Sequence, residues 1–173
     1  MLLGNTQKIM TTSMLTELTP ELFAQFWPTF TAIAKAEATY AYEADISQAS
    51  AQALWCTLPL QSFAWVENGA VLGIYYLKAN AMGPGKHVCN CGYMVSEAAR
   101  GKGIARSMCE HSQQQALAAG FSAMQFNCVV STNDVAVKLW QKLGFDIVGT
   151  LPKAYRHGEL GLVDCYVMFK TLQ

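Results

Sequence analysis

Residues 94–105, which read Met-Val-Ser-Glu-Ala-Ala-Arg-Gly-Lys-Gly-Ile-Ala, constrain the fold of this chain more than any other segment. An apolar strand is predicted to end here, a short basic loop to follow, and a helix to begin. Because Gly101 and Gly103 flank Lys102, three consecutive backbone N–H groups can lie open beside the helix start. Open N–H groups at the positive end of a helix dipole bind phosphate, and Arg100 adds positive charge. The segment therefore predicts a strand–loop–helix unit that holds a phosphorylated cofactor.

Two common phosphate-binding motifs do not fit this loop. A Walker loop needs four residues between its first glycine and Gly-Lys-Ser/Thr, and that spacing is missing. A dinucleotide fingerprint needs a third glycine where this chain has Arg106, and an acid at the end of the next strand, where residues 123–130 have none. A nucleotide-binding protein of either kind is therefore disfavoured. What remains is the pattern Arg100-x-x-Gly103-x-Ala105 between a strand and a helix.

This pattern resembles the pyrophosphate loop of the GNAT superfamily of acetyl-CoA-dependent N-acetyltransferases, which reads Gln/Arg-x-x-Gly-x-Gly/Ala. Residues 133–145 carry a second resemblance, because an Asn opens a predicted helix that ends in Leu-Trp-Gln-Lys-Leu-Gly-Phe. The family has Leu-Tyr-x-x-x-Gly-Phe there, so the chain departs from it at Trp140. The resemblance is specific over residues 87–170, and over residues 5–79 it rests on the order of elements alone.

The hydrophobic pattern predicts the element order β-α-α-β-β-β-α-β-α-β-β, which is also the order that the resemblance implies. The expected strands lie within residues 10–18 and at 62–67, 70–79, 87–95, 123–130, 146–150 and 163–170, and the expected helices at 20–38, 47–55, 104–119 and 133–143. Asn68-Gly69 predicts a hairpin, Pro28 a kink or restart of the first helix, and residues 87–130 a right-handed parallel crossover. We therefore expect a mixed α/β (α+β) fold: one acyl-CoA N-acyltransferase-like domain over residues 1–173, with a central mixed sheet of about seven strands flanked by about four helices.

The resemblance implies acetyl-CoA as the acetyl donor and no metal. In the family the strand that here ends at Met94 and Val95 splays from its neighbour, and the pantetheine arm pairs with it as an added strand. The family's Asn at the position of Asn133 contacts that arm, and Asn133 is also expected to cap its helix. Trp140 is expected either to pack on the pantetheine or to be a plain core residue. The expected cofactor-binding residues are Met94, Val95, Arg100, Gly101, Lys102, Gly103, Ile104, Ala105, Asn133 and Trp140.

The groups that would move protons are less well defined by the sequence. The indole of Trp140 is too weak an acid to replace the family's Tyr as proton donor to the leaving thiolate. Tyr155, Tyr166 or a water can take that role, and a thiol with the usual pKa of about 8.5 can also leave without a dedicated acid. Glu37 is a candidate general base through a water, although exposed surface charge is the alternative for it and for neighbouring Glu43 and Asp45.

The acceptor pocket is expected around Tyr40, which follows the first helix, and around two polar residues in apolar strands, Asn90 and Asn127. Each Asn is interpreted as a pocket residue or a structural bridge, since a buried amide must find partners. Residues 151–161 are expected to form a long functional loop, or else a bulged loop packed at the sheet edge or in a dimer contact. Side chains of this loop expected on the acceptor side are Tyr155, Arg156 and His157.

Composition excludes several other classes of protein. Twelve basic and twelve acidic residues balance, which argues against a nucleic-acid surface or a basic membrane patch. No apolar run approaches the roughly 18 residues of a membrane helix, and residues 1–8 lack a signal-peptide pattern, so a cytoplasmic location is expected. The six cysteines and three histidines are scattered, so we expect free thiols and neither a disulfide nor a zinc site.

The sequence thus predicts an acetyl-CoA-dependent N-acetyltransferase in which a small primary amine, such as an amino acid or an amino-acid analogue, attacks the thioester directly in a ternary complex. A protein or peptide amine is the alternative acceptor, and an open, shallow pocket would favour it. Because Trp140 stands where the family usually has Tyr, another alternative is a GNAT-fold module that binds CoA without turnover. The acceptor amine, the general acid and base, and the number of subunits stay open. The apolar C-terminal strands are compatible with a homodimer, and an ordinary core explains them equally well.

Overall fold

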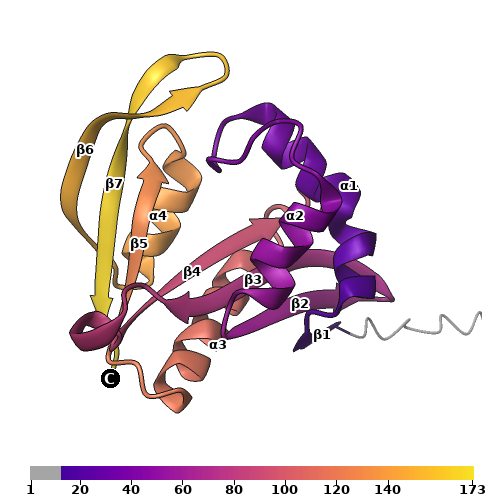
Figure 1. Ribbon diagram of the computed structural model, residues 1–173, viewed down its shortest axis with the longest axis horizontal. Coiled ribbons are helices and arrows are strands. Elements are labelled where there is room, and N and C mark those ends of the chain that lie inside the picture. The colour runs from indigo at the N-terminus through magenta and orange to yellow at the C-terminus, as the bar shows by residue number, and fades with distance from the viewer. Residues whose placement is uncertain (1–12) are drawn as a thin grey trace, which may run out of the picture.

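Seven strands of the chain form one mixed sheet in the order β1-β2-β3-β4-β5-β7-β6 (Figure 1). The computed structural model describes residues 13–173, so residues 10–12 of the first predicted strand lie outside the described part. Of the described strand pairs, β4 and β5 run parallel and the other neighbours run antiparallel. The strands are β1 (Ser13–Glu17), β2 (Gln61–Glu67), β3 (Ala70–Ala79), β4 (Val88–Val95), β5 (Ala123–Val130), β6 (Asp146–His157) and β7 (Gly161–Thr171). The predicted fold class and element order are confirmed.

The predicted hairpin between β2 and β3 is present at Asn68-Gly69. Both residues have positive φ, 51° and 80°, as a type I′ hairpin turn requires. The strands pair from Glu67 opposite Ala70 onward, so the turn fixes their register.

Helix α1 (Pro20–Ala36) begins as the sequence predicts, with Thr19 Oγ1 accepting from the Leu22 backbone N–H at 3.3 Å. Pro28 lies inside this one helix and does not restart it. The aromatic face formed by Phe23, Phe26 and Phe30 is fully buried, and that packing outweighs the hydrogen bond that proline removes. Glu37 ends the helix in the left-handed region.

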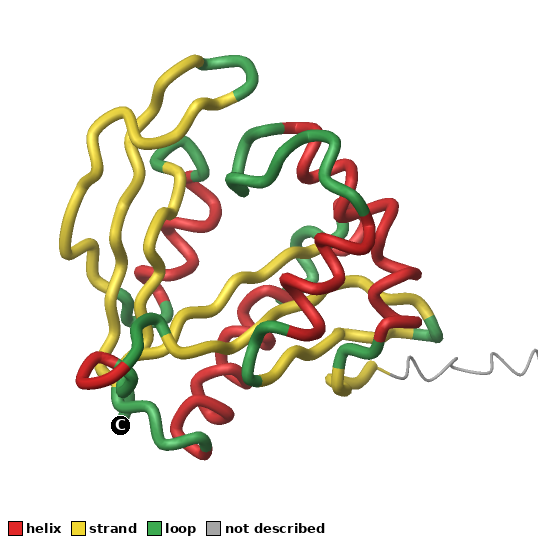
Figure 2. The backbone as a smooth tube through the Cα atoms, viewed as in Figure 1, coloured by secondary structure: helices red, strands yellow, loops and turns green. Residues whose placement is uncertain are grey.

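The other helices follow the predicted positions with small differences. Helix α2 (Gln48–Gln52) is shorter than predicted, because the chain widens into a π-helical turn at Ala53–Thr57. Helix α3 (Ile104–Ala118) leads to Gly120, whose φ of 85° allows the chain to turn away (Figure 2). Helix α4 (Asp134–Lys142) is capped by Asn133, whose Oδ1 accepts from the Ala136 N–H at 3.3 Å. No helix within residues 13–173 is both long and apolar enough to cross a membrane.

Side chains of β3 point alternately to the two faces of the sheet, and each face has its own core layer. Ile74 packs with the aromatic face of α1 and with Trp55, whereas Leu77 packs with residues of α3 and α4. The paired α1 and α2 therefore cover one face of the sheet, and α3 and α4 cover the other.

The prediction of a long loop at residues 151–161 is wrong. Strand β6 runs on to His157 and β7 starts at Gly161, so the two strands form one long hairpin. The turn is closed by His157 Nδ1, which accepts from the backbone N–H groups of Glu159 at 3.1 Å and Leu160 at 3.3 Å. Sequence pattern misses this strand because β6 is an edge strand with exposed residues on both faces and a register shift between Leu151 and Tyr155.

Candidate functional site

The two parallel strands at the middle of the sheet separate soon after they pair. The ladder between β4 and β5 holds Val88 opposite Ala123 and Cys89 opposite Met124, and ends there. At the next residue, Asn90, the side-chain Nδ2 donates to the Gln125 carbonyl at 2.9 Å and spans the widening gap. Beyond Asn90 the strands diverge as a fork (Figure 1). This is the splay that the family resemblance implied.

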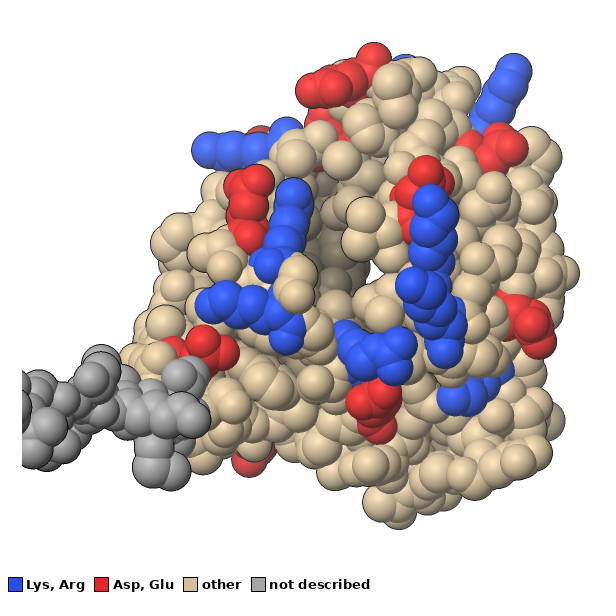
Figure 3. All heavy atoms as spheres, turned by 180° about the vertical axis from the view of Figure 1, so that it is seen from behind, with Lys and Arg blue, Asp and Glu red and all other residues tan. Residues whose placement is uncertain are grey.

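A cavity of about 340 Å³ occupies the fork. That volume lies at the lower end of the range for small-molecule sites. Seen from behind, the molecule is hollowed between its two halves, and Lys and Arg side chains lie beside the hollow (Figure 3). The four predicted acceptor residues, Tyr40, Asn90, Asn127 and Tyr155, all lie on the cavity wall, as do Asn133 and Trp140.

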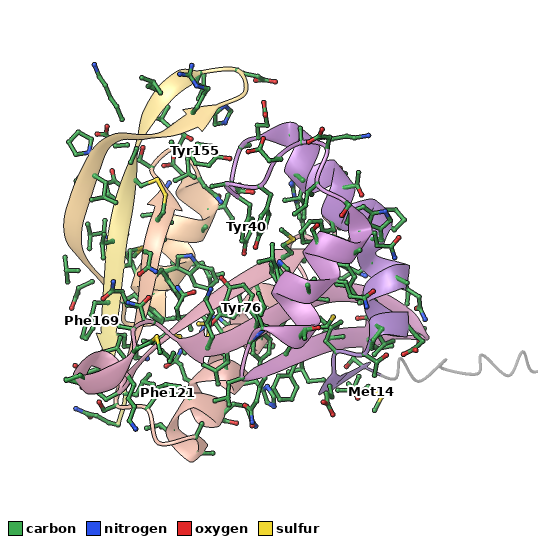
Figure 4. All side chains as sticks on the ribbon, in the orientation of Figure 1. Met14, Tyr40, Tyr76, Phe121, Tyr155 and Phe169 are labelled. Atoms are coloured by element: carbon green, nitrogen blue, oxygen red, sulfur yellow. A yellow bond between two sulfur atoms is a disulfide. The ribbon has the colours of Figure 1, made fainter. Side chains whose placement is uncertain are left out.

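Tyr40 and Tyr155, here called the roof, bridge the two arms of the fork, and the cavity stays open to solvent beside them (Figure 4). Tyr155 on β6 donates its hydroxyl to the Tyr40 carbonyl at 3.0 Å, and Tyr40 donates its own hydroxyl to the Tyr93 carbonyl on β4 at 2.7 Å. The hairpin tip adds a backbone bond from the Gly158 N–H to the Glu37 carbonyl at 3.0 Å. The segment after α1 is thus held between the two arms of the fork.

Burial changes the acidity of both roof tyrosines. Loss of hydration raises the pKa of Tyr40 well above the usual tyrosine value, and the nearby hydroxyls of Tyr76 and Tyr42 act in the same direction. The pKa of Tyr155 is raised mainly by burial and secondarily by the negative charge of Glu37. Both hydroxyls therefore stay protonated at neutral pH and are hydrogen-bond donors.

A polar wall lies at the narrow end of the fork. Asn90 Oδ1 accepts from the Tyr76 hydroxyl at 3.2 Å, while its Nδ2 bridges to β5. Asn127 Oδ1 accepts from Gln125 Nε2 at 2.9 Å, and its Nδ2 donates to Asn80 Oδ1 at 2.8 Å. The two asparagines are thus structural bridges and cavity-wall residues at once, which the sequence treated as alternatives.

An aromatic wall faces the wider part of the fork. Trp140 is 8% exposed, and its ring centroid lies 5.1 Å from that of Tyr93 and 5.2 Å from that of Phe126. Trp140 therefore belongs to the core and also lines the cavity.

The glycine loop after β4 lies outside the cavity lining and has the geometry of an anion site. Gly101 and Gly103 have φ values of 77° and 76°, and a Cβ at either position would meet nothing within 4 Å. No side chain caps α3 at Gly103, so the first N–H groups of the helix have no capping side chain as a partner. One expectation is corrected: the Lys102 N–H is not open, because it donates to the Ala99 carbonyl at 3.4 Å in a short helical turn.

The side chains in and next to the glycine loop differ in exposure: some are exposed and others are buried. Arg100 and Lys102 are exposed and form ion pairs with Glu97 at 3.7 Å and with Glu67 at 3.6 Å. Ile104 is buried in the core and Ala105 is half-buried, so these two residues offer the loop only backbone. Met94 and Val95, at the end of β4, pair with β3 and do not line the cavity.

No carboxylate of the described residues lines the cavity. Glu37, the candidate base, is exposed at the end of α1, and Glu43 and Asp45 are also exposed. Tyr166, the alternative proton donor, packs against the core from β7 and does not reach the cavity lining. Arg156 and His157, expected on the acceptor side, also lie outside it.

Several wall residues were missed by reasoning from the sequence: Tyr76, Lys78 and Tyr93. The available signal was the alternation Tyr76-x-Lys78-x-Asn80 at the end of an otherwise apolar strand, which places these polar side chains on one face. Lys78 is the one charged side chain that the described residues contribute to the wall.

The prediction that all cysteines are free is wrong for one pair. Cys128 on β5 and Cys165 on β7 form a disulfide, with their Cα atoms 5.0 Å apart. The two residues are 37 positions apart and become neighbours only because β7 pairs beside β5, where β5 has a register shift. The other four cysteines carry free thiols. Among residues 13–173, no group of three or more His, Cys, Asp or Glu side chains could hold a metal ion.

Comparisons with known proteins agree with this geometry. A family model described as acetyltransferase (GNAT) family matches residues 19–145. N-acetyltransferase aca1 of Schizosaccharomyces pombe is 37% identical over 99 residues, which are 57% of this chain and 47% of that protein. The chain therefore spans about half the length of this curated relative.

Solved structures extend the likeness to the whole fold. A GCN5-related N-acetyltransferase from Kribbella flavida is 38% identical, with a TM-score of 0.87 over 92% of this chain and 98% of that chain. The structure of yncA from Salmonella typhimurium with its cofactor acetyl-CoA has a TM-score of 0.79 over 94% and 95% of the two chains. At 18% identity the second likeness is one of fold alone. With its forked sheet and glycine loop, and with a family model that matches most of its length, this chain belongs to the acetyltransferase (GNAT) family.

Proposed function

We propose that this chain transfers the acetyl group of acetyl-CoA to a primary amine of a small molecule, such as an amino acid or an amino-acid analogue, by direct attack in a ternary complex. The observation that carries the proposal is the roofed cavity at the fork. A cavity of only about 340 Å³, spanned by the bond between Tyr155 and Tyr40, favours a small acceptor over a protein or peptide. The named relative and the family support acetyl transfer to nitrogen.

The residues of the glycine loop fit a pyrophosphate. Open space at Gly101 and Gly103, an uncapped helix end and two nearby cations are the features that such a group needs. The arm that follows would lie along the unpaired edge of β4 near Met94 and Val95, with Asn133 and Trp140 on its other side. When bound, acetyl-CoA supplies an activated acyl group, and its presence in yncA supports this choice of donor.

The cavity wall supplies hydrogen-bonding side chains that can orient the substrates, and it supplies no carboxylate among the described residues. Because no carboxylate lines the described cavity, the amine is expected to enter in its neutral form and to lose its proton to water after attack. Tyr155 stays protonated, but its hydroxyl already donates to the roof. The backbone N–H groups near Met94 and Val95 stay the predicted oxyanion contacts.

The first experiment is thermal unfolding with acetyl-CoA, run beside NADH and ATP. A ligand at about 100 times its dissociation constant adds about 2.7 kcal/mol of stability, so acetyl-CoA alone is expected to raise Tm. Gly103→Asn and Gly103→Asp form a matched pair, since both side chains tolerate positive φ and only one is charged. We expect Gly103→Asp to lose the shift and Gly103→Asn to keep most of it. An equal shift in both variants would contradict the placement of the pyrophosphate.

A CoA-binding module without turnover is the second candidate, favoured by Trp140 at the family's usual Tyr position. Release of the CoA thiol in the presence of any amine rejects it. A cytoplasmic location and a homodimer stay predictions.

A further inference from the structure

We propose that Lys78 binds a carboxylate of the acceptor, so that the amines acetylated are amino acids or related amino-carboxylates. This inference rests on the proposed function and narrows it to one substrate class. It is carried by the charge of the cavity wall, which is positive at Lys78 and lacks any acidic side chain among the described residues.

Lys78 occupies a defined place on that wall. It stands directly opposite Asn90 in the register of β3 and β4, and two residues after Tyr76, so the three side chains share one face of the sheet. Its Nζ lies 5.2 Å from the centroid of the Tyr76 ring. Lys78 is exposed, and that contact places its ammonium beside the polar wall at the solvent side of the cavity.

The other polar groups of this wall are already engaged. Tyr76 donates to Asn90, and the side chains of Asn90 and Asn127 bridge the strands. The Lys78 ammonium, by contrast, takes part in none of the ion pairs or side-chain hydrogen bonds formed within residues 13–173. Its ammonium N–H groups are therefore free to bind an anionic part of a ligand.

The same charge has a consequence for the reacting amine. A cation near a bound amine lowers the pKa of that amine and favours the neutral form that attacks. It also repels acceptors with a second positive charge, such as polyamines. An amino acid suits both effects, because its carboxylate pairs with Lys78 while its amine reaches toward the fork.

The test measures CoA thiol release with acetyl-CoA and matched acceptor pairs: L-alanine, L-methionine and L-phenylalanine, each beside its carboxamide, with putrescine as a dication. The enzyme variants are Lys78→Met, Lys78→Arg and, as a control, Lys86→Met, because Lys86 is exposed and lies outside the cavity wall. Each acceptor is compared with itself across the variants, so differences in intrinsic amine pKa cancel.

We expect Lys78→Met to raise KM for the amino acids by about tenfold or more and to leave KM for the carboxamides within about twofold. Lys78→Arg should retain most of the preference for the acids, and Lys86→Met should behave as wild type. Equal effects of Lys78→Met on acid and amide would overturn the inference.

The proposed function and this inference fail differently. If wild type acetylates carboxamides or putrescine but no amino acid, the inference falls and acetyl transfer stands. If no amine releases thiol although acetyl-CoA raises Tm, both fall, and the chain is a CoA-binding module.

Discussion

Tyr155 shows how one side chain joins distant parts of the chain at the site. It is 6% exposed, and its hydroxyl bonds to the carbonyl of Tyr40, 115 residues earlier in the sequence. Since the hydroxyl is committed to this bond, we interpret Tyr155 as a positioning residue for the roof.

We predict that Tyr155→Phe lowers the free energy of unfolding by about 1 kcal/mol, because the half-buried Tyr40 carbonyl loses its donor. We expect kcat to fall less than about tenfold, since a positioned general acid contributes more than that. Chemical denaturation and steady-state kinetics measure the two effects. Tyr166→Phe is the control, because Tyr166 lies outside the cavity lining. A loss in kcat of about a hundredfold would instead make Tyr155 the proton donor.

At the level of elements, β4 shapes the site because it pairs with β3 along its length and with β5 only at its start. Gly92 lies opposite Tyr76 in that register. A Cβ at Gly92 would lie 2.6 Å from Tyr76 Cε1, and the Tyr76 ring is held by Asn90 and by an edge contact with Trp55 at 4.9 Å.

Gly92→Ala is therefore predicted to destabilise the protein by about 1–3 kcal/mol through overpacking, and to raise KM for the acceptor as the Tyr76 ring moves. Gly149→Ala is the matched control, because Gly149 also lies in a strand, lacks a positive φ and has open space around its Cβ position. We expect that variant to be neutral or slightly more stable. Urea unfolding of both variants tests the contrast, and equal midpoints would show that Tyr76 is not confined as described.

The elements that sequence reasoning predicted well are those whose signals are local. The hairpin at Asn68-Gly69, the caps at Thr19 and Asn133, and the glycine loop before α3 each depend on residues within a few positions. Strand β6 was predicted too short because an exposed edge strand lacks an apolar face that the sequence pattern would reveal. Its pairing with β7 stabilises it instead.

The site was predictable only where its residues also have a local signal in the sequence. Asn90 and Asn127 attract notice as amides in apolar strands, but only the fork shows that each bridges strands while facing the cavity. Little in the sequence indicates that Lys78 matters. Its importance comes from the absence of other charged side chains on the described cavity wall, and that wall is assembled from four strands and three other segments of the chain.

At the scale of the whole molecule, buried and half-buried tyrosines connect the core to the cavity and determine how the protein responds to high pH. Burial raises the pKa of six of them above the usual value of about 10: Tyr40, Tyr42, Tyr75, Tyr76, Tyr93 and Tyr155. In the unfolded chain these groups ionise near pH 10, whereas in the folded chain they keep their protons. Their contribution to stability is therefore complete below about pH 10 and is lost as pH rises above it.

We predict alkaline unfolding within about two pH units above 10. Each of these tyrosines removes up to about 1.4 kcal/mol of stability per pH unit in that range, and a typical domain has only about 5–15 kcal/mol in total. The absorbance of tyrosinate and the far-ultraviolet circular dichroism should therefore change together in one steep transition, while the urea-unfolded chain titrates gradually near pH 10. Tyr42→Phe removes one ionisable group, whose hydroxyl accepts a hydrogen bond from Trp55 Nε1 at 3.0 Å. Once its free energy of unfolding at pH 7 is taken into account, this variant should unfold at a higher pH than wild type. Gradual ionisation of the folded protein with its helix signal intact would show that these hydroxyls are open to water.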